Sequence, residues 1–161
     1  MHNLTSKTVC FTGHRKIPVL KSISLKRKLK KTIEQRIAEG FCCFCAGGAL
    51  GFDTLAAQTV LELKKQYPNI ELILVLPCES QTLGWKEKDI EIYEDIKRQA
   101  DEVVYTAKEY TRGCMHKRNR YLVDHSSACI AYLTESTGGT AYTVDYAIKH
   151  GLSVCNIADD L

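Results

Sequence analysis

The chemistry that this chain offers is concentrated in short stretches rich in glycine. The stretch with the clearest spacing is Gly138-Gly139-Thr140, which follows an apolar run and precedes a helix-like segment. Paired glycines let backbone N–H groups approach a ligand closely, and the first turn of a helix adds unpaired donors and the positive end of a dipole. Such a group of donors binds a phosphate or a carboxylate. The nearby Tyr142 is placed to stack its ring on a flat ligand.

A second glycine pair, Gly47-Gly48, lies between another apolar run and another helix-like segment. Glycine-rich turns of this kind are common, so the pair alone is a weak signal. Gly51 and Asp53 follow closely, and together they make a turn that both admits a ligand and starts a helix. Asp53 has two readings that stay open: it caps the helix, or it accepts a hydrogen bond from a ribose hydroxyl.

Polar residues also follow the first apolar run of the chain. Thr12, Gly13, His14 and Arg15 stand where that run ends. The carboxyl ends of parallel strands are where ligands enter open α/β sheets, so we expect these residues at a ligand site. For His14 two roles stay open, a hydrogen bond to the adjacent turn and a contact with the ligand.

Two further side chains fit a nucleotide-type ligand. Trp85, the only tryptophan, lies in a loop after the apolar run at 70–77, where it serves either as core or as a platform for a flat ring. Arg118 lies with Asn119 in a helix-like segment that follows a loop of aromatic and basic residues. A guanidinium in that position can fork onto a phosphate or a carboxylate.

Regular elements must bring these stretches together, and the hydrophobic pattern predicts such elements along the whole chain. Apolar runs predict strands, and apolar residues repeated every three or four positions predict amphipathic helices. Strands and helices alternate, which predicts an α/β domain of three layers, with a mainly parallel sheet of about six strands and helices on both faces. The predicted strands are 8–13, 41–46, 70–77, 102–105, 128–133 and 153–157, and the predicted helices are 24–39, about 52–66, 89–100, one that ends near 126, and 139–150.

Composition sets bounds on the class of protein. The 161 residues fit a single domain, 1–161, by the prior of roughly 150 residues per domain. The fractions of hydrophobic residues, 45%, and charged residues, 25%, are ordinary for a soluble globular protein. The N-terminal residues lack the apolar stretch that secretion requires, and no apolar run is long enough to span a membrane. We therefore expect a cytoplasmic protein that does not bind membranes.

Charge and cysteine content narrow the choice of partners and cofactors. The formal net charge of +3 is small, and basic and aromatic residues interleave only between Tyr110 and Tyr121, so we expect no nucleic-acid partner. The eight cysteines are expected to be reduced thiols. The cluster Cys42, Cys43 and Cys45 lacks the second ligand pair of a zinc site, so we interpret its members as buried thiols and expect no metal.

The signature motifs of several enzyme classes are absent from the sequence. Neither G-x-x-x-x-G-K-[ST] nor G-x-G-x-x-G occurs. Their absence speaks against a P-loop kinase or ATPase and against an ordinary dinucleotide dehydrogenase. We expect that the protein requires no cofactor and that its ligand is a small nucleotide derivative.

Taken together, the motifs resemble the SLOG superfamily of Rossmann-like proteins, and within it the YpsA-like branch. The resemblance covers nearly the whole chain. It implies a Rossmann-like sheet whose glycine loops bind a nucleotide-type ligand at the carboxyl edge. The motifs that carry the resemblance are Phe11-Thr12-Gly13-His14-Arg15, Gly47-Gly48-Ala49-Leu50-Gly51-Phe52-Asp53, Trp85, Tyr93, Tyr110-Thr111-Arg112-Gly113-Cys114-Met115, Arg118-Asn119-Arg120-Tyr121 and Gly138-Gly139-Thr140-Ala141-Tyr142-Thr143.

A resemblance to the LOG phosphoribohydrolases implies a reaction, the cleavage of the N-glycosidic bond of nucleoside monophosphates. The stretch 115–119, Met-His-Lys-Arg-Asn, is similar to their Met-His-Glu-Arg-Lys motif. Matching the paired glycines to their Pro-Gly-Gly-x-Gly-Thr-x-x-Glu motif puts Asp145 at the glutamate position. The resemblance thus implies that Arg118 and Asp145 act at a ribose. The chain departs from the motif at Thr137, Ala141 and Tyr142.

A third resemblance leaves another function open. The stretch 48–53, Gly-Ala-Leu-Gly-Phe-Asp, is similar to the glycine and aspartate motif of the DprA proteins, which load single-stranded DNA during transformation. The hypotheses are therefore a nucleotide-binding sensor, an N-glycoside hydrolase and a DprA-like protein. We favour the first, because the glycine loops occur without an intact catalytic motif. We also expect a homodimer or higher homo-oligomer, with helices such as 24–39 and 139–150 pairing across a two-fold axis.

Overall fold

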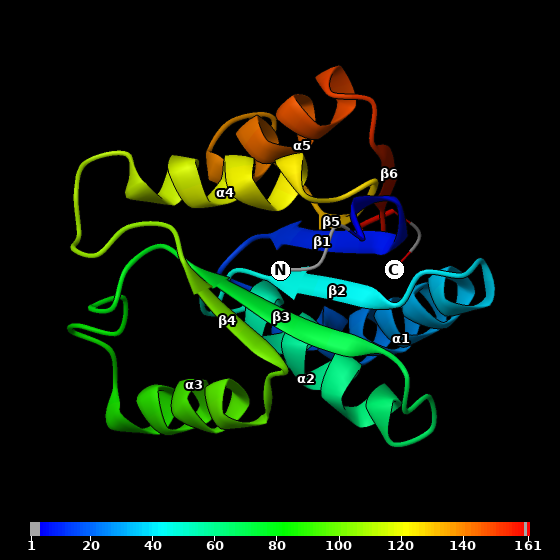
Figure 1. The fold of residues 1–161 in the computed structure, drawn as a ribbon, viewed down its shortest axis with the longest axis horizontal. Coiled ribbons are helices and arrows are strands. Elements are labelled where there is room, and N and C mark those ends of the chain that lie inside the picture. The colour runs from blue at the N-terminus through cyan, green and yellow to red at the C-terminus, as the bar shows by residue number, and fades with distance from the viewer. Residues whose placement is uncertain (1–3, 160) are drawn as a thin grey trace.

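The chain folds into alternating strands and helices, as the hydrophobic pattern predicts (Figure 1). The computed structural model describes residues 4–159 and 161, so the predicted domain 1–161 also includes residues 1–3 and 160, which lie outside the described residues. The strands are β1 Thr8–Gly13, β2 Cys43–Ala46, β3 Glu71–Leu76, β4 Glu102–Tyr105, β5 Ala128–Tyr132 and β6 Ser153–Asn156. The α-helices are α1 Ser22–Ala38, α2 Phe52–Lys64, α3 Glu87–Gln99, α4 Cys114–Asp124 and α5 Gly139–Lys149, and two short 3-10 helices are η1 Thr5–Lys7 and η2 Val19–Lys21.

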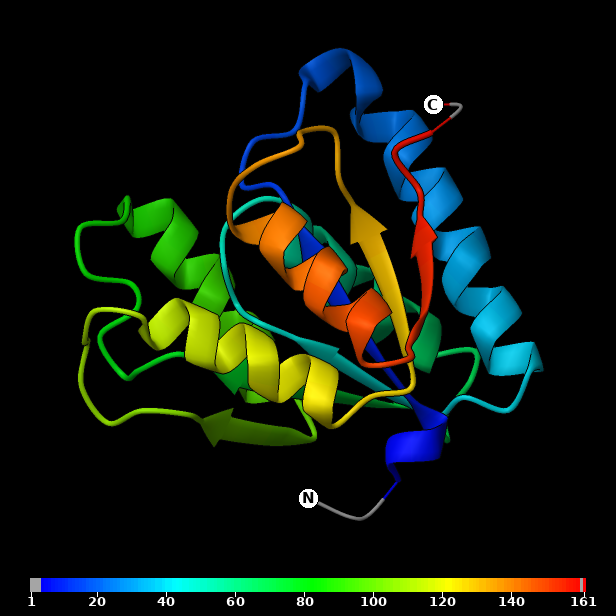
Figure 2. The ribbon, with the colours of Figure 1, turned by 90° about the horizontal axis from the view of Figure 1, so that it is seen from above.

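The strands form one parallel sheet in the order β4-β3-β2-β1-β5-β6. The first four strands are added in one direction, and β5 then returns to the other side of β1. Because crossovers between parallel strands are right-handed, this reversal puts the later helices on the opposite face of the sheet. Helices α1, α2 and α3 cover one face, and α4 and α5 cover the other (Figures 1 and 2). The prediction of a three-layer α/β fold is confirmed.

The reversal creates a switch point between β1 and β5. These strands pair directly, with Val9 opposite Ala128 and Gly13 opposite Tyr132. The chain leaves the carboxyl end of β1 towards α1 on one face and the carboxyl end of β5 towards α5 on the other. Loops that diverge in this way leave a crevice where ligands bind in open α/β sheets.

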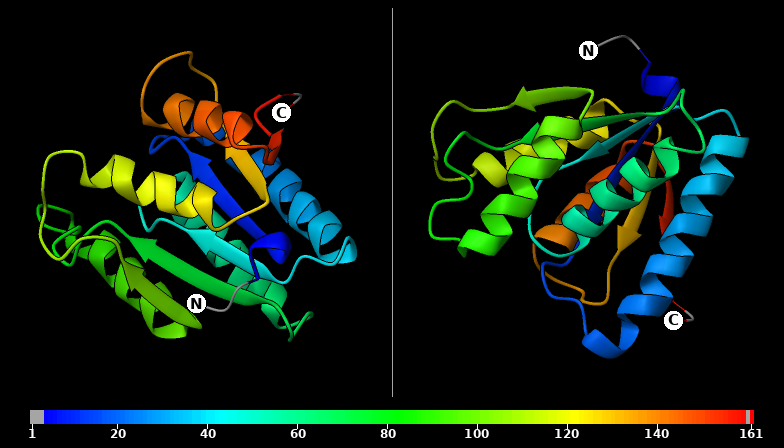
Figure 3. Two further views of the ribbon diagram at one scale, coloured as in Figure 1. Left: turned by 45° about the horizontal axis from the view of Figure 1, so that its top comes forward. Right: turned by 90° about the horizontal axis from the view of Figure 1, so that it is seen from below.

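Alternating side chains of the strands fill two cores, one on each face. On the face covered by α1 and α2, Phe11 stacks on Phe44 with ring centroids 6.2 Å apart and meets the edge of Phe52 at 6.4 Å. The right-hand view of Figure 3 shows α1, α2 and α3 over this face. Among the described residues, no helix combines the length and the apolar character needed to cross a membrane.

The opposite core contains the cysteines. Cys10 lies in register with Cys45 on one side and Cys129 on the other, and these small thiols let α4 and α5 pack closely on the sheet. Cys43 and Cys45 are also buried in this core, and burial raises the pKa of the Cys43 thiol to about 12. The interpretation of the cluster as buried thiols is correct for these two residues, and Cys42 is half-buried beside them.

Candidate functional site

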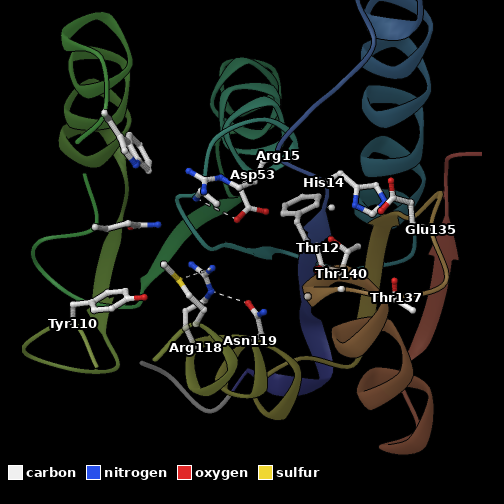
Figure 4. A pocket seen from close by; sticks show the side chains of 18 of the residues that line it. Thr12, His14, Arg15, Asp53, Tyr110, Arg118, Asn119, Glu135, Thr137 and Thr140 are labelled. Atoms are coloured by element: carbon white, nitrogen blue, oxygen red, sulfur yellow. Dashed lines mark hydrogen bonds between the residues drawn. The ribbon is translucent and has the colours of Figure 1, made fainter. Parts of the chain in front are cut away.

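A cavity of about 530 Å³ lies at the carboxyl edge of the sheet, next to the switch point (Figure 4). This volume falls in the range of small-molecule sites, roughly 300–1,000 Å³. The loops after β1, β2, β3 and β5 and the first turns of α4 form its walls. Most of the predicted site residues line it, namely Thr12, Gly13, His14, Arg15, Asp53, Trp85, Arg118, Asn119, Gly138, Gly139 and Thr140.

The wall at the start of α5 consists mostly of backbone. Gly138 is the N-cap residue with a φ of 104°, and the first helical bond runs from the N–H of Tyr142 to its carbonyl at 3.0 Å. The N–H groups of Gly139 and Thr140 precede that bond, so helix geometry leaves them without partners inside the helix. A Cβ added at either glycine would meet no protein atom within 4 Å. This wall therefore offers donors and space to an anion.

The loop after β1 is joined to the loop after β5 across the switch point. Nε2 of His14 accepts a hydrogen bond from the N–H of Thr134 at 2.9 Å, and the His14 ring meets the Tyr132 ring edge-on at 5.7 Å. An accepting Nε2 requires the ring proton to be on Nδ1. His14 also lines the cavity. Both roles that the sequence left open, a hydrogen bond to a neighbouring turn and a contact with a ligand, are therefore compatible with the structure.

Gly47, Gly48 and Gly51 were expected to contact the ligand, but they are not among the residues that line the cavity. A Cβ at Gly51 would lie 2.1 Å from the carbonyl oxygen of Arg15, and one at Gly48 would lie 2.5 Å from a methyl group of Leu76. The carbonyl of Gly47 accepts hydrogen bonds from Nη1 of Arg118 and from Nε2 of Gln81. These residues are glycines because other parts of the chain approach them, and the prediction of direct contact is corrected.

Arg118 and Asp53 form a buried charged centre in the cavity wall. They are 5% and 7% exposed, and an added Cβ at Gly47 would meet both, Nη1 of Arg118 at 2.5 Å and Oδ2 of Asp53 at 2.9 Å. Nε of Arg118 donates to Oδ1 of Asn119 at 2.8 Å, and Oδ2 of Asp53 accepts from the N–H of Ala49 at 3.3 Å. The guanidinium is thus held in place, with part of its donor fork available for an oxygen-rich ligand.

Burial dominates the titration of both groups. Burial raises the pKa of Asp53, and the charges of Arg118 and Arg15 oppose that rise. Burial lowers the pKa of Arg118, and Asp53 opposes that change. The ionised form of each group is therefore stabilised by the opposite charge of the other group. Asp53 is not the helix cap, because Gly51 occupies the N-cap position of α2, so its contact with a ribose stays a prediction.

The opposite end of the cavity is aromatic. Trp85 packs its ring edge-on against Tyr93 at 5.5 Å at the edge of the core, and it also lines the cavity. Its role as a platform for a flat ring stays a prediction. Tyr110 is 68% exposed at the rim. Figure 4 shows Tyr110 on one side, Thr137 and Thr140 on the other, and Asp53 and Arg118 between them. Rings at one end and helix N–H groups at the other suit a ligand with a flat ring and an anionic group.

Several lining residues were not among the predicted site residues. Gln81 is buried in the loop after β3, where it donates to Gly47 at 3.2 Å and accepts from the hydroxyl of Tyr93 at 3.2 Å. Its place after the carboxyl end of a strand is the signal that points to it. The same signal applies to Glu135, which follows β5. The other unpredicted lining residues are Phe11, Ala49, Leu83, Tyr110, Met115 and Thr137.

Two predicted residues on α5 do not reach the cavity. Tyr142 faces a second hollow beside α4, where its ring meets the edge of His116 at 4.5 Å. Asp145 lies on the outer surface, where its side chain is 62% exposed and pairs with Lys149 at 2.8 Å. The buried stripe of α5 consists of Thr140, Thr143, Val144 and Ala147, and one residue after Val144 the helix has turned by about 100°.

The expected catalytic role of Asp145 is corrected accordingly. A match of Gly139-Thr140 to the Gly-Thr pair of the LOG motif moves the glutamate position to Thr143, which is buried and bonds the carbonyl of Gly139 through its hydroxyl at 2.9 Å. No carboxylate stands at that position in this chain. Matching the glycine pair alone does not determine which residue of the following helix stands at each motif position or which face of the helix it occupies.

The position of Asp145 leads to a first prediction. Asp145→Asn is expected to leave the melting temperature and the binding of any cavity ligand unchanged, because an exposed ion pair within one helix contributes little. Thermal denaturation and calorimetric titration of the variant beside the wild type measure both quantities. A loss of ligand binding without loss of folding would show that this carboxylate reaches the ligand after all.

The parallel sheet, its switch point and the glycine-lined helix start define a Rossmann-like domain with a ligand site at the carboxyl edge. The chain belongs to the YspA SLOG family, whose sequence model, YpsA, matches residues 10–154. The SPbeta prophage-derived protein YoqJ of Bacillus subtilis is 34% identical over 140 residues, covering 79% of this chain and 82% of that protein. A UPF0398 protein of Bacillus thuringiensis is 32% identical over 130 residues, covering 79% and 71%. The resemblance to the YpsA-like branch is confirmed.

Solved structures of DNA processing protein A share the fold. The protein from Helicobacter pylori superimposes with a TM-score of 0.65 at 18% identity, over 94% of this chain and 65% of that one, and its structure describes a single-stranded DNA binding mode. DprA from Streptococcus pneumoniae gives a TM-score of 0.66 at 16% identity, over 98% of this chain and 53% of that one. The expectation that excludes nucleic acid as a partner is therefore wrong, because a protein with this fold is described as binding it.

Proposed function

We propose that this SLOG domain binds a nucleotide or a nucleotide derivative in the cavity at its switch point. The phosphate lies against the start of α5, at Gly138 and Gly139, and the base lies towards Tyr110 and Trp85. This arrangement puts the ribose near the Asp53 carboxylate. It is supported by the donors at one end of the cavity, the rings at the other and the buried charges between them.

The observation that carries the proposal concerns Gly139. Its φ lies outside the left-handed region, and a Cβ built on it would meet nothing within 4 Å. Alanine is also the better helix former of the two. Nothing in the described part of the protein therefore requires glycine at this position. A ligand that approaches the backbone closely does require it.

Gly139→Ala separates ligand binding from folding. We expect the affinity for nucleoside monophosphates, NAD or ADP-ribose, whichever the wild type binds most tightly, to fall by about ten-fold or more, because the methyl group occupies the space of an anion whose donors are worth about 1.5–3 kcal/mol. The melting temperature is expected to stay the same or rise. Isothermal titration calorimetry and thermal denaturation measure the two effects.

The control is Gly40→Ala, at the opposite edge of the sheet. Gly40 has a φ of 101° and also has open space around its Cβ position, so its alanine variant should lose stability and keep its affinity. Equal binding by Gly139→Ala and the wild type would contradict the placement of the anion. Failure of the wild type to bind any of these ligands would contradict the proposal itself.

N-glycoside hydrolysis has less support than binding. The resemblance assigns the carboxylate of the LOG-like mechanism to Asp145, and Asp145 lies outside the cavity. The carboxylates that do line the cavity are Asp53 and Glu135, and neither stands at a position of the LOG motif. Chromatography for free base after incubation with nucleoside monophosphates tests the reaction, and we expect no release of free base.

The homo-oligomeric state of the protein stays a prediction.

A further inference from the structure

Three hollows follow one another along α4. The first is the ligand cavity, which includes Tyr110 and Met115 at its rim. The second, of about 650 Å³, begins at the adjacent Thr111 and extends over the start of α4 to Tyr142. The third, of about 370 Å³, shares Lys117 and Arg120 with the second and extends to Tyr105. We call the surface formed by these three hollows the α4 track.

The α4 track is basic beyond the cavity. Arg112, Lys117 and Arg120 line the second hollow, and no carboxylate lines it. The one acid of the third hollow is Asp124, whose Oδ1 accepts a hydrogen bond from the hydroxyl of Tyr146 at 2.8 Å. The first turn of α4 also contains no acidic residue. The track therefore attracts a ligand with several negative charges in a row.

Aromatic rings alternate with these basic side chains. Tyr142 is 38% exposed, and its hydroxyl accepts a hydrogen bond from Nη1 of Arg120 at 3.5 Å while its ring rests against His116. Tyr110 is exposed at the rim of the cavity, and Tyr105 is exposed in the third hollow, where the ammonium of Lys97 lies 5.6 Å from its ring centroid. Figure 2 shows α4 and α5 lying side by side. Helix α4 and the segment before it supply most of the second and third hollows, and α5 adds Tyr142. Each hollow thus combines positive charge with a tyrosine ring that is at least partly exposed.

We infer that the α4 track binds single-stranded nucleic acid, with one nucleotide in the cavity and the following ones along α4. Bases stack on exposed rings only when they are unpaired, and backbone phosphates pair with Lys and Arg. An acidic peptide would pair with the basic side chains and leave the tyrosine rings without a partner. A dinucleotide would be too short to reach beyond the second hollow. This inference rests on the proposed function, because the track starts at the nucleotide cavity.

The first experiment varies the length of the ligand. Fluorescence anisotropy compares labelled oligothymidylate of about 12 nucleotides, a labelled dinucleotide, a duplex of the same length and a polyglutamate peptide. We expect the single strand to bind at least ten-fold more tightly than each of the others, with an affinity that falls as salt rises.

The second experiment removes charge from the track and, as a control, from elsewhere. Lys117→Gln combined with Arg120→Gln is expected to weaken oligonucleotide binding ten-fold or more and to make the salt dependence shallower by about 1.4, at about 0.7 for each phosphate contact. The matched control is Lys26→Gln combined with Lys30→Gln on α1, where both lysines pair with Glu62. The control removes the same net charge and should leave oligonucleotide binding within two-fold of wild type.

Base stacking is tested separately at Tyr142. Tyr142→Ala should weaken oligonucleotide binding about five-fold or more, since stacking contributes about 1–3 kcal/mol for each base. Tyr142→Phe keeps the ring and should restore most of the affinity. Both variants should bind a nucleoside monophosphate as the wild type does, because Tyr142 does not line the cavity.

The outcomes distinguish this inference from the proposed function. If the single strand binds no more tightly than the dinucleotide, or if the two charge variants lose affinity equally, the inference is overturned while mononucleotide binding in the cavity stands. Preference for the duplex or the peptide also overturns it. If neither oligonucleotide nor mononucleotide binds to the wild type, both are overturned.

Discussion

Arg118→Leu is expected to lower the free energy of unfolding by about 3–5 kcal/mol at neutral pH, the largest effect we predict for a substitution in the site. The guanidinium is almost fully buried, holds the carbonyl of Gly47 and the amide of Asn119, and opposes the burial penalty on Asp53. Leucine fills part of the space and leaves a buried carboxylate without its positive neighbour. Ligand binding is expected to be lost as well.

The pH dependence of this deficit has a definite sign. Burial holds the pKa of Asp53 above its unfolded value, so between those two values the folded state binds more protons and becomes more stable as the pH falls. Without Arg118 the folded pKa of Asp53 rises further. The deficit of the variant relative to wild type should therefore be largest at neutral pH and should shrink on acidification below that raised pKa.

Denaturant unfolding at several pH values measures this behaviour. The double variant Arg118→Leu, Asp53→Asn should recover part of the lost stability at neutral pH, because the uncompensated charge is gone. Arg98→Leu is the matched control, since Arg98 lies exposed on α3 beside Asp95, and it should change the stability little at any pH. A deficit that is independent of pH and unaffected by Asp53→Asn would contradict this account of the charged centre.

Gly51→Ala is expected to destabilise the fold by about 3 kcal/mol, through backbone strain and through a clash with the chain. Gly51 has a φ of 82°, and its Cβ position lies 2.1 Å from the carbonyl oxygen of Arg15. The neighbouring N–H of Phe52 donates to the carbonyl of His14 at 3.1 Å, so this contact holds the loop after β1 against the start of α2. The melting temperature should fall by about 6–12 °C for a domain of this size.

Gly84→Ala isolates the contribution of the close contact. Gly84 has a nearly identical φ of 84°, but a Cβ there would meet nothing within 4 Å. Its alanine variant should show the strain alone, about 1–2 kcal/mol. Thermal denaturation of both variants gives the difference, and equal losses at the two positions would contradict the predicted clash of the added methyl group with Arg15.

The sequence was sufficient for the fold because buried parallel strands are continuous apolar runs and their helices carry an apolar stripe. The prediction extended the second strand to Phe41, whereas pairing begins at Cys43, opposite Thr8. The residue at which a strand begins depends on where its hydrogen bonds to the partner strand begin. The expectation against a nucleic-acid partner relied on the small net charge of the chain. A sum over the chain does not report that Arg112, Lys117 and Arg120 line the same hollow.

For the site, the sequence by itself determined which segments meet, because residues after parallel strands must gather at one edge of the sheet. Thr12, Arg118 and Gly139 line the cavity for that reason. Only the tertiary structure decided which glycine lines the cavity and which is crowded by the protein, since the backbone of Arg15 approaches Gly51 closely and Gly139 has open space around it. It also decided that Asp145 points outwards, because the packing of α5 on the sheet sets the rotation of that helix.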